Sequence, residues 1–310
     1  MAYPGPMPVR IATFNLKDFF LPRKDAERPV VEAKLANVAA NLRRAKADVV
    51  ALQEVGEPEM LARLLALVPE LGYGDPVVGT EDKRGIRCAI LSRLPVQWSQ
   101  VHAPRTLPFP RFYESDPEPY PNRIPLRRGV VHVRVEVEGI GEVDVVTAHF
   151  KSNRGAPMRG EDGSEIEDTS ARGRGEAAIR SLIQRAAEAL FVRGVVDDVL
   201  RASPDHAICV LGDLNDTMDS LPIRVLRGLG EPPIGVLHAC ADTVPPERRF
   251  SCFHGAGRSL IDHILATAPL RQRLVEMQIQ NEALRDHGAY ADDPPLSEDS
   301  DHALCVATFG

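Results

Sequence analysis

The stretch VRIATFN at residues 9–15 and the stretch DVVALQEV at residues 48–55 are both short, nearly continuous apolar runs. Runs of this kind are typical of strands that are buried on both faces of a sheet. Between them, apolar residues recur at helical spacing within residues 29–48, which predicts a helix. The first 55 residues therefore predict a β-helix-β unit whose two strands end in the polar residues Asn15 and Glu54.

The rest of the chain continues this mixed pattern, with more strands than helices. Strands are predicted at residues 88–92, 96–101, 129–137, 143–149, 207–211, 261–266, 274–279 and 303–309, and helices at residues 61–68 and 177–191. Several strands follow one another without a helix, which indicates an antiparallel part of the sheet structure. The apolar residues of the helix at 177–191 share one face, as in an amphipathic helix: Ile179, Leu182, Ile183, Ala186 and Leu190.

Two long irregular segments interrupt the pattern, at residues 103–125 and 151–176. Loops of this length are uncommon in a compact domain and are often functional or mobile. The first is rich in proline and carries arginines and aromatic residues, a composition that suits stacking on the bases of a nucleic acid. The second is rich in glycine and arginine with interspersed acids, and ordinary mobile surface is the alternative for both. With no internal repeat, we expect one α/β domain over residues 1–310.

Composition excludes several classes of protein. The chain has 310 residues, 44% hydrophobic and 26% charged, so disorder and fibrous repeats are not expected. A formal net charge of −7 argues against a protein that coats polyanions indiscriminately, but it allows a local basic cleft.

The sequence shows no pattern typical of a membrane segment, a secretory signal or a disulfide framework. No apolar run approaches the roughly 20 residues of a transmembrane segment, and the start of the chain lacks the pattern of a secretory signal. We therefore expect a cytoplasmic protein, or a secreted one if a signal has been removed from this sequence. The five cysteines have no CxxC spacing, and we expect all of them to be reduced.

Polar and acidic residues occur where the apolar strands stop: Asn15, Glu54, His149, Asp213 with Asn215, Asp262, and Asp301 with His302. Each has an ordinary structural explanation when taken alone, such as a turn cap or a hydrogen-bonded core histidine. Together at one sheet edge, their oxygen atoms would form a site for Mg²⁺ or Mn²⁺. Such an ion favours phosphate chemistry, because it neutralises the phosphate and orients a nucleophilic water.

In their order along the chain, six segments resemble the endonuclease/exonuclease/phosphatase superfamily, the deoxyribonuclease I-like proteins. They are IATFNLKDFF at 11–20, DVVALQEV at 48–55, TAHFKS at 147–152, VLGDLND at 210–216, SLIDHIL at 259–265 and SDHALCVATF at 300–309. GDLND and SDH are the most specific of these, and the bacterial nuclease-like members are the most similar branch. The resemblance implies a four-layer α/β sandwich, in which two packed mixed β-sheets are flanked by helices and the site lies at one rim.

The resemblance also implies a role for each residue of the metal and water site. Glu54 is expected to be the main metal ligand, with Asn15 and Asp301 completing the coordination directly or through water. Asp213 is expected to orient or deprotonate the attacking water, and Asn215 to hold that water or a phosphate oxygen.

Two histidines are implied to contact the scissile phosphate. They are His302, held by the carboxylate of Asp262, and His149. An aspartate beside an imidazole fixes its orientation and favours its charged form. Which group removes the proton from water is open at this point, because a base must lie within hydrogen-bond reach of it.

Basic residues near these segments are candidates for binding substrate. Arg127 and Arg128 stand where the family often places a phosphate-binding side chain, and one of them would have to turn inward. Lys151 begins the second long loop. Lys17 departs from the Asn, Asp or Glu that many relatives have there, so we expect one strongly bound ion, since a cation repels a second one. Lys17 contacting the substrate phosphate is the alternative.

These observations lead to three hypotheses for function. The first is a Mg²⁺- or Mn²⁺-dependent phosphodiesterase that hydrolyses nucleic acid by direct attack of metal-positioned water. The second is a phosphatase or phosphodiesterase acting on a small phosphoester, such as an inositol phosphate or a phospholipid headgroup, and the third is a non-catalytic binding module. No obligate protein partner is inferred, and motifs of serine hydrolases, P-loop enzymes and zincins are absent from the sequence.

Overall fold

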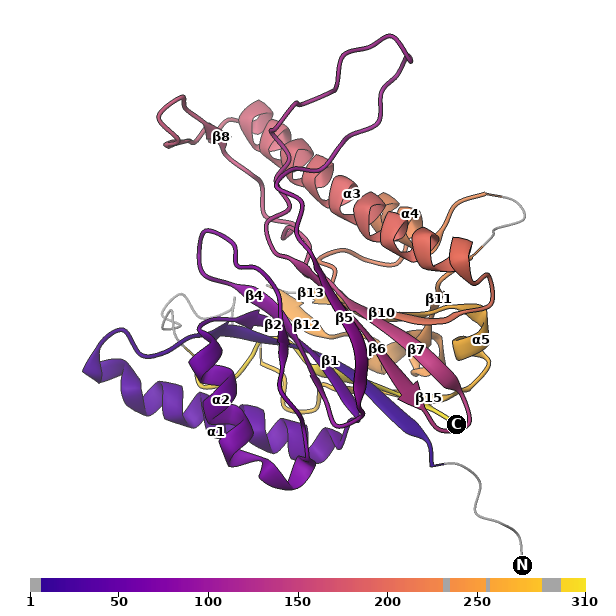
Figure 1. The fold of residues 1–310 in the computed structure, drawn as a ribbon. Coiled ribbons are helices and arrows are strands. Elements are labelled where there is room, and N and C mark those ends of the chain that lie inside the picture. Colours follow the sequence, from indigo (N-terminus) through magenta and orange to yellow (C-terminus); the bar gives the residue numbers. More distant parts are fainter. Residues whose placement is uncertain (1–6, 231–234, 255–256, 286–296) are drawn as a thin grey trace, which may run out of the picture.

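Two six-stranded β-sheets pack face to face, and helices cover their outer faces (Figure 1). This computed structural model describes residues 7–230, 235–254, 257–285 and 297–310. The arrangement is the four-layer α/β sandwich that the sequence predicts.

The first sheet has the strand order β15-β16-β1-β2-β4-β3. Its strands are β1 (Val9–Phe19), β2 (Val49–Val55), β3 (Val77–Val78), β4 (Arg87–Ser92), β15 (Leu274–Gln280) and β16 (Leu304–Phe309). The strands β1 and β2 run parallel and are joined by the helix α1 (Arg28–Ala45), which confirms the predicted β-helix-β unit. The other neighbours in this sheet are antiparallel.

The second sheet has the order β11-β14-β10-β7-β6-β5. Its strands are β5 (Val96–His102), β6 (Val130–Val137), β7 (Gly141–Thr147), β10 (Ala207–Asp213), β11 (His238–Ala239) and β14 (Asp262–Ala266). Only β7 and β10 are parallel, and the long helix α3 (Ala171–Ala202) joins them. The remaining elements are α2 (Pro58–Leu67), α4 (Leu221–Arg227), α5 (Ala268–Arg271), and the short pairs β8–β9 (Met158–Arg159, Glu165–Ile166) and β12–β13 (Cys252–His254, Gly257–Ser259).

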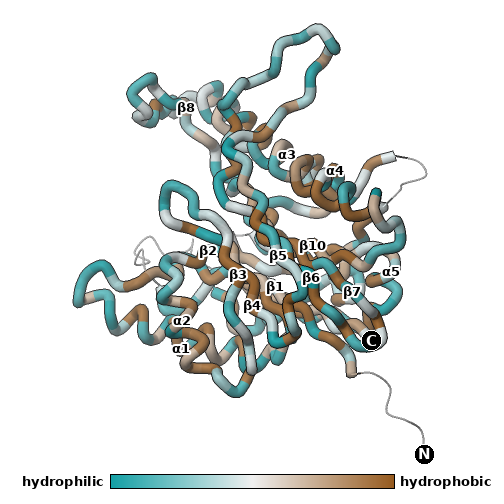
Figure 2. Tube along the Cα trace, viewed as in Figure 1, coloured by the Kyte–Doolittle hydropathy of each residue, from teal (hydrophilic) through white to brown (hydrophobic). Residues whose placement is uncertain are grey.

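Three hydrophobic clusters in the described residues each fill one contact between layers. Residues such as Ile11 of β1 and Val145 of β7 fill the space between the sheets. Phe14 of β1 points the other way, into a cluster with α1 and α2, and Val210 of β10 packs against α3 and α4. Because successive strand residues face opposite layers and both layers are apolar, the central strands are continuous hydrophobic runs, which are coloured brown in Figure 2.

The topology brings several strand ends to one rim of the sandwich. The parallel strands β1, β2, β7 and β10 end at this rim, and the antiparallel β14 and β16 begin there. Gly212, next to the end of β10, has φ of +144°, and a Cβ at this position would lie 2.0 Å from the carbonyl oxygen of Ala148. Only glycine fits this close approach between β10 and the segment that follows β7.

The helix α3 differs from the sequence prediction in length and in the face it buries. It begins at Ala171, inside the predicted loop at residues 151–176, and continues to Ala202. The apolar face is partly exposed: the exposed fractions of Ile179, Leu182 and Leu190 are 58%, 40% and 42%. In this part of the helix, polar side chains are buried instead, because they bond to main-chain groups of the neighbouring loops: Ser181, Gln184 and Glu188.

Two smaller expectations concern membranes and cysteines. In the described segments we find no helix with the length and apolar character needed to span a bilayer. All five cysteines are buried and free, as expected from their spacing.

A buried ionic cluster lies on the outer face of the second sheet. The carboxylate of Asp144 is fully buried and accepts hydrogen bonds from Arg134 Nε at 2.6 Å and from the ring of His132 at 3.0 Å. His206 Nε2 lies 3.2 Å from the same carboxylate. Burial alone would raise the pKa of Asp144, but the hydrogen bonds from His132 and Arg134 hold it below its ordinary value.

Replacing Asp144 therefore tests whether this cluster stabilises the fold. Asp144→Asn should lower the free energy of unfolding by about 3 kcal/mol, because Arg134 loses its buried counter-charge. Urea unfolding at pH 7 measures this, with Asp198→Asn as a control that should change stability by less than about 0.5 kcal/mol because its ion pair with Arg201 is exposed. Equal midpoints for Asp144→Asn and the parent would contradict the assignment.

Candidate functional site

The rim gathers side chains from both sheets. Asn15 is the last regularly paired residue of β1 before its irregular end, Glu54 lies near the end of β2, and Asp213 ends β10. Asp262 begins β14 directly opposite Asp213 in the antiparallel register. His302 precedes β16, whose antiparallel pairing with β1 brings it to the same place.

Asn15 is the centre of the contacts between the two sheets. Its amide nitrogen donates to Asp213 Oδ2 at 2.9 Å and lies 3.4 Å from Glu54 Oε1. Its amide oxygen accepts from the backbone N–H of Lys17 at 2.9 Å, which fixes the orientation of the amide. His149 Nε2 completes the group, 3.3 Å from Asp213 Oδ2 and 4.0 Å from Glu54 Oε1.

A second group holds the imidazole of His302. Its Nδ1 lies 2.8 Å from Asp262 Oδ2, and its Nε2 points toward Asp213 Oδ2 at 3.9 Å. Ser251 donates its hydroxyl to the same oxygen of Asp262 at 2.7 Å and accepts the backbone N–H of Asp262. Ser251 thus fixes the Asp262 carboxylate, and this carboxylate in turn fixes the ring of His302. The predicted pairing of Asp262 with His302 is present.

The backbone at the rim adopts an uncommon conformation. Glu54 has φ of +59° and Asn215 has φ of +54°, values in the left-handed region that non-glycine residues seldom occupy. Asn215 is held by its backbone N–H on Asp213 Oδ1 and by its amide on the carbonyl of Phe150, both at 3.0 Å. Such conformations concentrate at functional sites, where the surrounding structure over-determines them.

The electrostatics of the rim show an excess of buried negative charge. Burial raises the pKa of Asp213 to about 7; the charge of His302 opposes this rise, and Asp262 and Glu54 add to it. Burial alone would lower the pKa of His302, but the attraction of Asp262 and Asp213 raises it well above its ordinary value. Burial lowers the pKa of His149 well below its ordinary value, with a further contribution from Arg128. The rim therefore pairs a charged imidazole with a neutral one.

This donor set fits a hard divalent cation. Carboxylates of Glu54 and Asp213 share the Asn15 amide, and Asp301 lies close by, with its Oδ1 3.9 Å from His302 Nε2. Carboxylate oxygens are the ligands that Mg²⁺ and Mn²⁺ prefer. A dication would offset the repulsion from Asp262 and Glu54, which adds to the effect of burial on the pKa of Asp213. Asn15 directs its amide nitrogen, and not its amide oxygen, toward the acids. The amide can therefore orient the Asp213 carboxylate by donating a hydrogen bond to it.

Another grouping of donors occurs within the same rim. In the described residues, Asp213, Asp262 and His302 form one set whose donor atoms all lie within 4.8 Å of one another. A metal there would compete with the hydrogen bond between Asp262 and His302, which Ser251 supports. Glu54 is free of that conflict, since its partners among the described residues are the Asn15 amide, the His149 ring and the backbone N–H of Asp18.

Two lysines, Lys17 and Lys34, lie near the acids of the rim. Lys17, a candidate substrate contact, makes an ion pair with Asp301 at 3.2 Å. Lys34 was not predicted, although it interrupts the apolar face of α1 and is buried. It donates to the carbonyls of Ser297 and Asp299, which anchors the loop that carries Asp301. Burial, together with repulsion from Lys17, lowers the pKa of Lys34 to about 8.

The other basic candidates occupy three different environments. Arg128 is the arginine that turns inward: it is buried, pairs with Asp82 at 3.2 Å and donates to the carbonyl of His149. Arg127 is half-buried, and its Nε is buried without a hydrogen-bond partner among the described residues. Lys151 turns its ammonium onto the carbonyls of Ser152 and Arg154, so the structure does not bring it to the acids.

A buried polar network behind the rim was missed by the sequence analysis. Arg185 of α3 pairs with Asp216 at 3.0 Å and donates to the carbonyl of Ser152 and the side chain of Asn153. It thereby joins the turn after β10 to the loop after β7. The available signal was a polar face on α3, since Ser181, Gln184, Arg185 and Glu188 recur at helical spacing.

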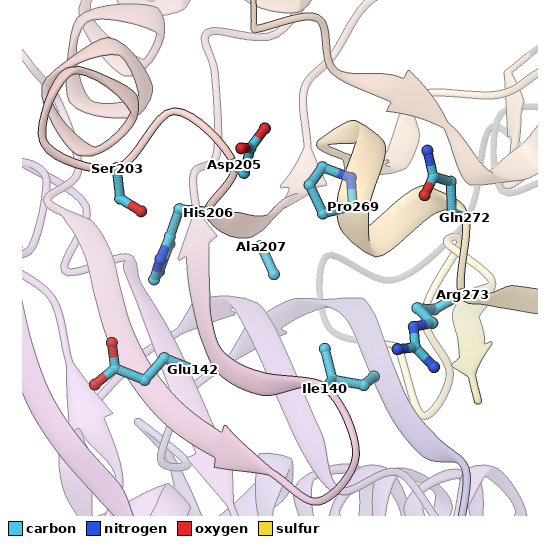
Figure 3. Close-up of a pocket in the computed structure, with 9 residues that line it drawn as sticks. All are labelled: Ile140, Glu142, Ser203, Asp205, His206, Ala207, Pro269, Gln272 and Arg273. Atoms are coloured by element: carbon cyan, nitrogen blue, oxygen red, sulfur yellow. The ribbon is translucent and has the colours of Figure 1, made fainter.

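A separate cavity of about 450 Å³ lies where β10 begins, at the opposite end of that strand from Asp213 (Figure 3). Its polar lining includes Glu142, His206 and Arg273. None of the candidate site residues lines it, so the chemistry of the rim does not extend there.

Comparison with known proteins gives a family for nearly the whole chain. The model of the endonuclease/exonuclease/phosphatase family matches residues 12–302. No curated protein matches the chain significantly.

Solved structures share the fold at low sequence identity. A humanized D. rerio TDP2 has a TM-score of 0.61 at 16% identity, with 98% of this chain and 99% of that chain covered. The human Nocturnin catalytic domain has a TM-score of 0.59 at 12% identity, with 98% and 94% covered. An endonuclease/exonuclease/phosphatase protein from Beutenbergia cavernae has a TM-score of 0.56 at 20% identity, with 97% and 71% covered.

Removing Arg185 tests whether the network behind the rim holds both loops. Arg185→Ala should cost about 3 kcal/mol of unfolding free energy, because Asp216 loses its buried partner. Hydrogen exchange should accelerate in residues 151–153 and 214–217 more than elsewhere. Arg172→Ala is the matched control, since that arginine is exposed and its loss should leave both measurements unchanged. Uniform acceleration across the chain would contradict a local role.

Proposed function

Because the chain belongs to the endonuclease/exonuclease/phosphatase family, we propose that it is a divalent-metal-dependent phosphodiesterase that hydrolyses nucleic acid with a metal-positioned water. One observation carries the proposal: Asn15 and Asp213, from different sheets, are hydrogen-bonded at 2.9 Å beside Glu54, His149 and His302. This convergence of carboxylates and imidazoles from both sheets supports the proposal, because hydrolysis of a phosphoester needs both kinds of group close together.

The proposed reaction adds water across a P–O bond. The water oxygen bonds to phosphorus, the ester oxygen leaves, and the leaving oxygen gains a proton. Asp213 receives the proton of the attacking water or orients that water, and Asn15 and Asn215 hold the carboxylate through its two oxygens. Binding of a dication would lower the raised pKa of Asp213 and keep its carboxylate ionised, as a proton acceptor must be before it receives the proton.

The two imidazoles play different parts. His302 is charged and held by Asp262, so it stabilises negative charge that develops on the phosphate. His149 is the second phosphate contact and acts as a neutral hydrogen-bond donor. Arg128 supports this part of the site by holding the carbonyl of His149.

A bound Mg²⁺ or Mn²⁺ would supply positive charge that polarises the phosphate and positions the water. Glu54 is the proposed main ligand, with Asp301 beside it. Lys17 pairs with Asp301 and adds a positive charge at the edge of the site, which disfavours a second dication. We therefore propose one strongly bound ion, with Lys17 and Arg127 available to contact substrate.

Nucleic acid is the favoured substrate because a D. rerio TDP2 of the same fold, 14% identical, was solved in complex with single strand DNA product. The family includes phosphatases as well as endonucleases and exonucleases, so membership supports phosphoester hydrolysis without choosing the substrate. The second hypothesis, a small phosphoester as substrate, and the third, a non-catalytic binding module, are tested by the substrate panel described below.

The first test removes the metal. EDTA should abolish hydrolysis, and Mg²⁺ or Mn²⁺ should restore it. Calorimetric titration with Mn²⁺ should give one tight site, whose affinity falls by about tenfold or more in Glu54→Gln because a charged ligand is lost. The exposed acid Glu59, changed to Gln, is the control that should bind like the parent. Turnover that persists in EDTA would refute the mechanism.

The second test addresses the water and the phosphate. Asp213→Asn should lower kcat by about a hundredfold or more through loss of the proton acceptor. His302→Ala should lower it by a similar factor through loss of transition-state stabilisation. Circular dichroism checks folding, and His238→Ala, at a half-buried position in β11, serves as the control. Variants as active as the parent would overturn the assignment of roles.

The substrate panel separates the hypotheses. Plasmid DNA, single-stranded DNA, RNA, inositol phosphates and sphingomyelin are each incubated with the protein and Mg²⁺ or Mn²⁺. Cleavage of a nucleic acid supports the proposal. Hydrolysis of only an inositol phosphate or sphingomyelin assigns the second hypothesis, and no hydrolysis under either metal assigns the third.

A further inference from the structure

Residues 103–125, the larger part of the loop between β5 and β6, project beyond the rest of the molecule at the top of Figure 1. We call these residues the arm. Near its tip, Phe112 is 93% exposed and Tyr113 is 73% exposed. Neither ring contacts another aromatic ring in the part of the chain that the structure describes. Two adjacent aromatic side chains held in water indicate a binding surface.

The arm is built to present these rings. The backbone N–H of Leu107 donates to the carbonyl of Ile124 at 2.7 Å and joins the two legs at the base. Farther out, the rings of Phe109 and Tyr120 meet edge to face at 5.6 Å. At the tip, the Asp116 carboxylate accepts the backbone N–H of Tyr113 at 3.0 Å. Seven prolines in the arm further restrict its backbone.

The base of the arm is tied to the rim. Leu107 and Ile124 pack against Ala187 of α3. Gln184, one turn earlier in α3, donates to the carbonyl of Pro125 at 2.8 Å and to Glu188 at 2.9 Å.

From Glu188 the connection continues to the rim itself. Glu188 accepts the backbone N–H of Lys151 at 2.7 Å, two residues after His149. Arg128, shortly after the arm, donates to the carbonyl of His149. A polymer held at the tip is therefore held by an element that is anchored to the catalytic residues.

The charge of the arm indicates what kind of contact it makes. Its three arginines, Arg105, Arg111 and Arg123, are balanced by Glu114, Asp116 and Glu118. Net attraction to a polyanion is therefore small, and the rings must supply the binding free energy. Flat apolar rings stack on the faces of unpaired bases, whereas the bases of a duplex are already stacked on each other.

We propose that the arm binds single-stranded nucleic acid by stacking its bases on Phe112 and Tyr113 while the same strand enters the catalytic rim. This inference rests on the proposed function and deepens it, because it gives the enzyme a preference for long unpaired strands. A lipid surface is the other partner that exposed aromatic residues can enter, and the test includes it as an outcome.

The experiment compares the double variant Phe112→Ala/Tyr113→Ala with the parent. Binding of a fluorescent 20-nucleotide single strand is measured by anisotropy in the Asp213→Asn background, so that the strand stays intact. The dissociation constant should rise about tenfold or more, since each stacked base contributes substantially. In the active protein, KM for this strand should rise while kcat, and hydrolysis of bis(p-nitrophenyl) phosphate, stay unchanged.

Two controls separate stacking from simple loss of apolar surface. Leu229→Ala/Val275→Ala removes residues that are 57% and 62% exposed but lie outside the arm, and it should bind the strand like the parent. Phe112→Trp/Tyr113→Trp should restore tight binding, because the indole also stacks.

Three results would overturn the inference. They are unchanged strand binding in the double alanine variant, an equal loss of affinity for single strands and duplexes, and loss of binding to phosphatidylglycerol vesicles in place of loss of binding to the strand. If the parent hydrolyses no phosphodiester, the proposed function fails, and the anisotropy measurement still decides whether the arm binds single strands.

Discussion

The hydrogen bond from the Asn15 amide to the Asp213 carboxylate joins residues 198 positions apart and connects the two sheets at the functional rim. It depends on face-to-face packing of the sheets, which aligns the ends of β1 and β10. Buried side-chain hydrogen bonds also connect the two sheets: Thr13 donates to Gln53 and Gln53 donates to Thr147, both at 3.1 Å. The site is therefore a property of the contact between sheets, and a change in their packing would separate its acids.

Burial of a polar group costs free energy unless the group has a hydrogen-bond or ionic partner, and several buried polar groups of this protein have such partners. Asp262 has Ser251 and His302, Asp144 has Arg134 and two histidines, and Arg185 has Asp216 and loop carbonyls. Each group satisfies hydrogen-bonding needs that water would otherwise meet. At Asp262 and Arg185 the same partners also hold the segments that form the rim, so stability and geometry there rest on the same contacts.

The rim combines an acidic centre with basic surroundings. Glu54, Asp213 and Asp301 gather negative charge, and Lys17, Lys34 and Arg128 lie around them. This arrangement gives a chain with a net charge of −7 a local group of cations, which the proposed binding of a phosphate beside one dication requires. The neutral arm adds recognition that does not rely on charge.

The sequence by itself determined the longer strands, the polar residues at their ends and the family to which the chain belongs, because apolar periodicity and short motifs are local properties. The short strands β3 and β11 at the edges of the sheets were not predicted, because two-residue strands have no periodicity to detect. It also predicted the pairing of Asp262 with His302. Only the tertiary structure decided that the Asn15 amide nitrogen faces Asp213, that Arg128 turns inward, and that α3 exposes Ile179 while it buries Arg185. Those outcomes depend on partners far along the chain: an apolar stripe specifies a helix, but the groups packed against that helix decide which face is buried.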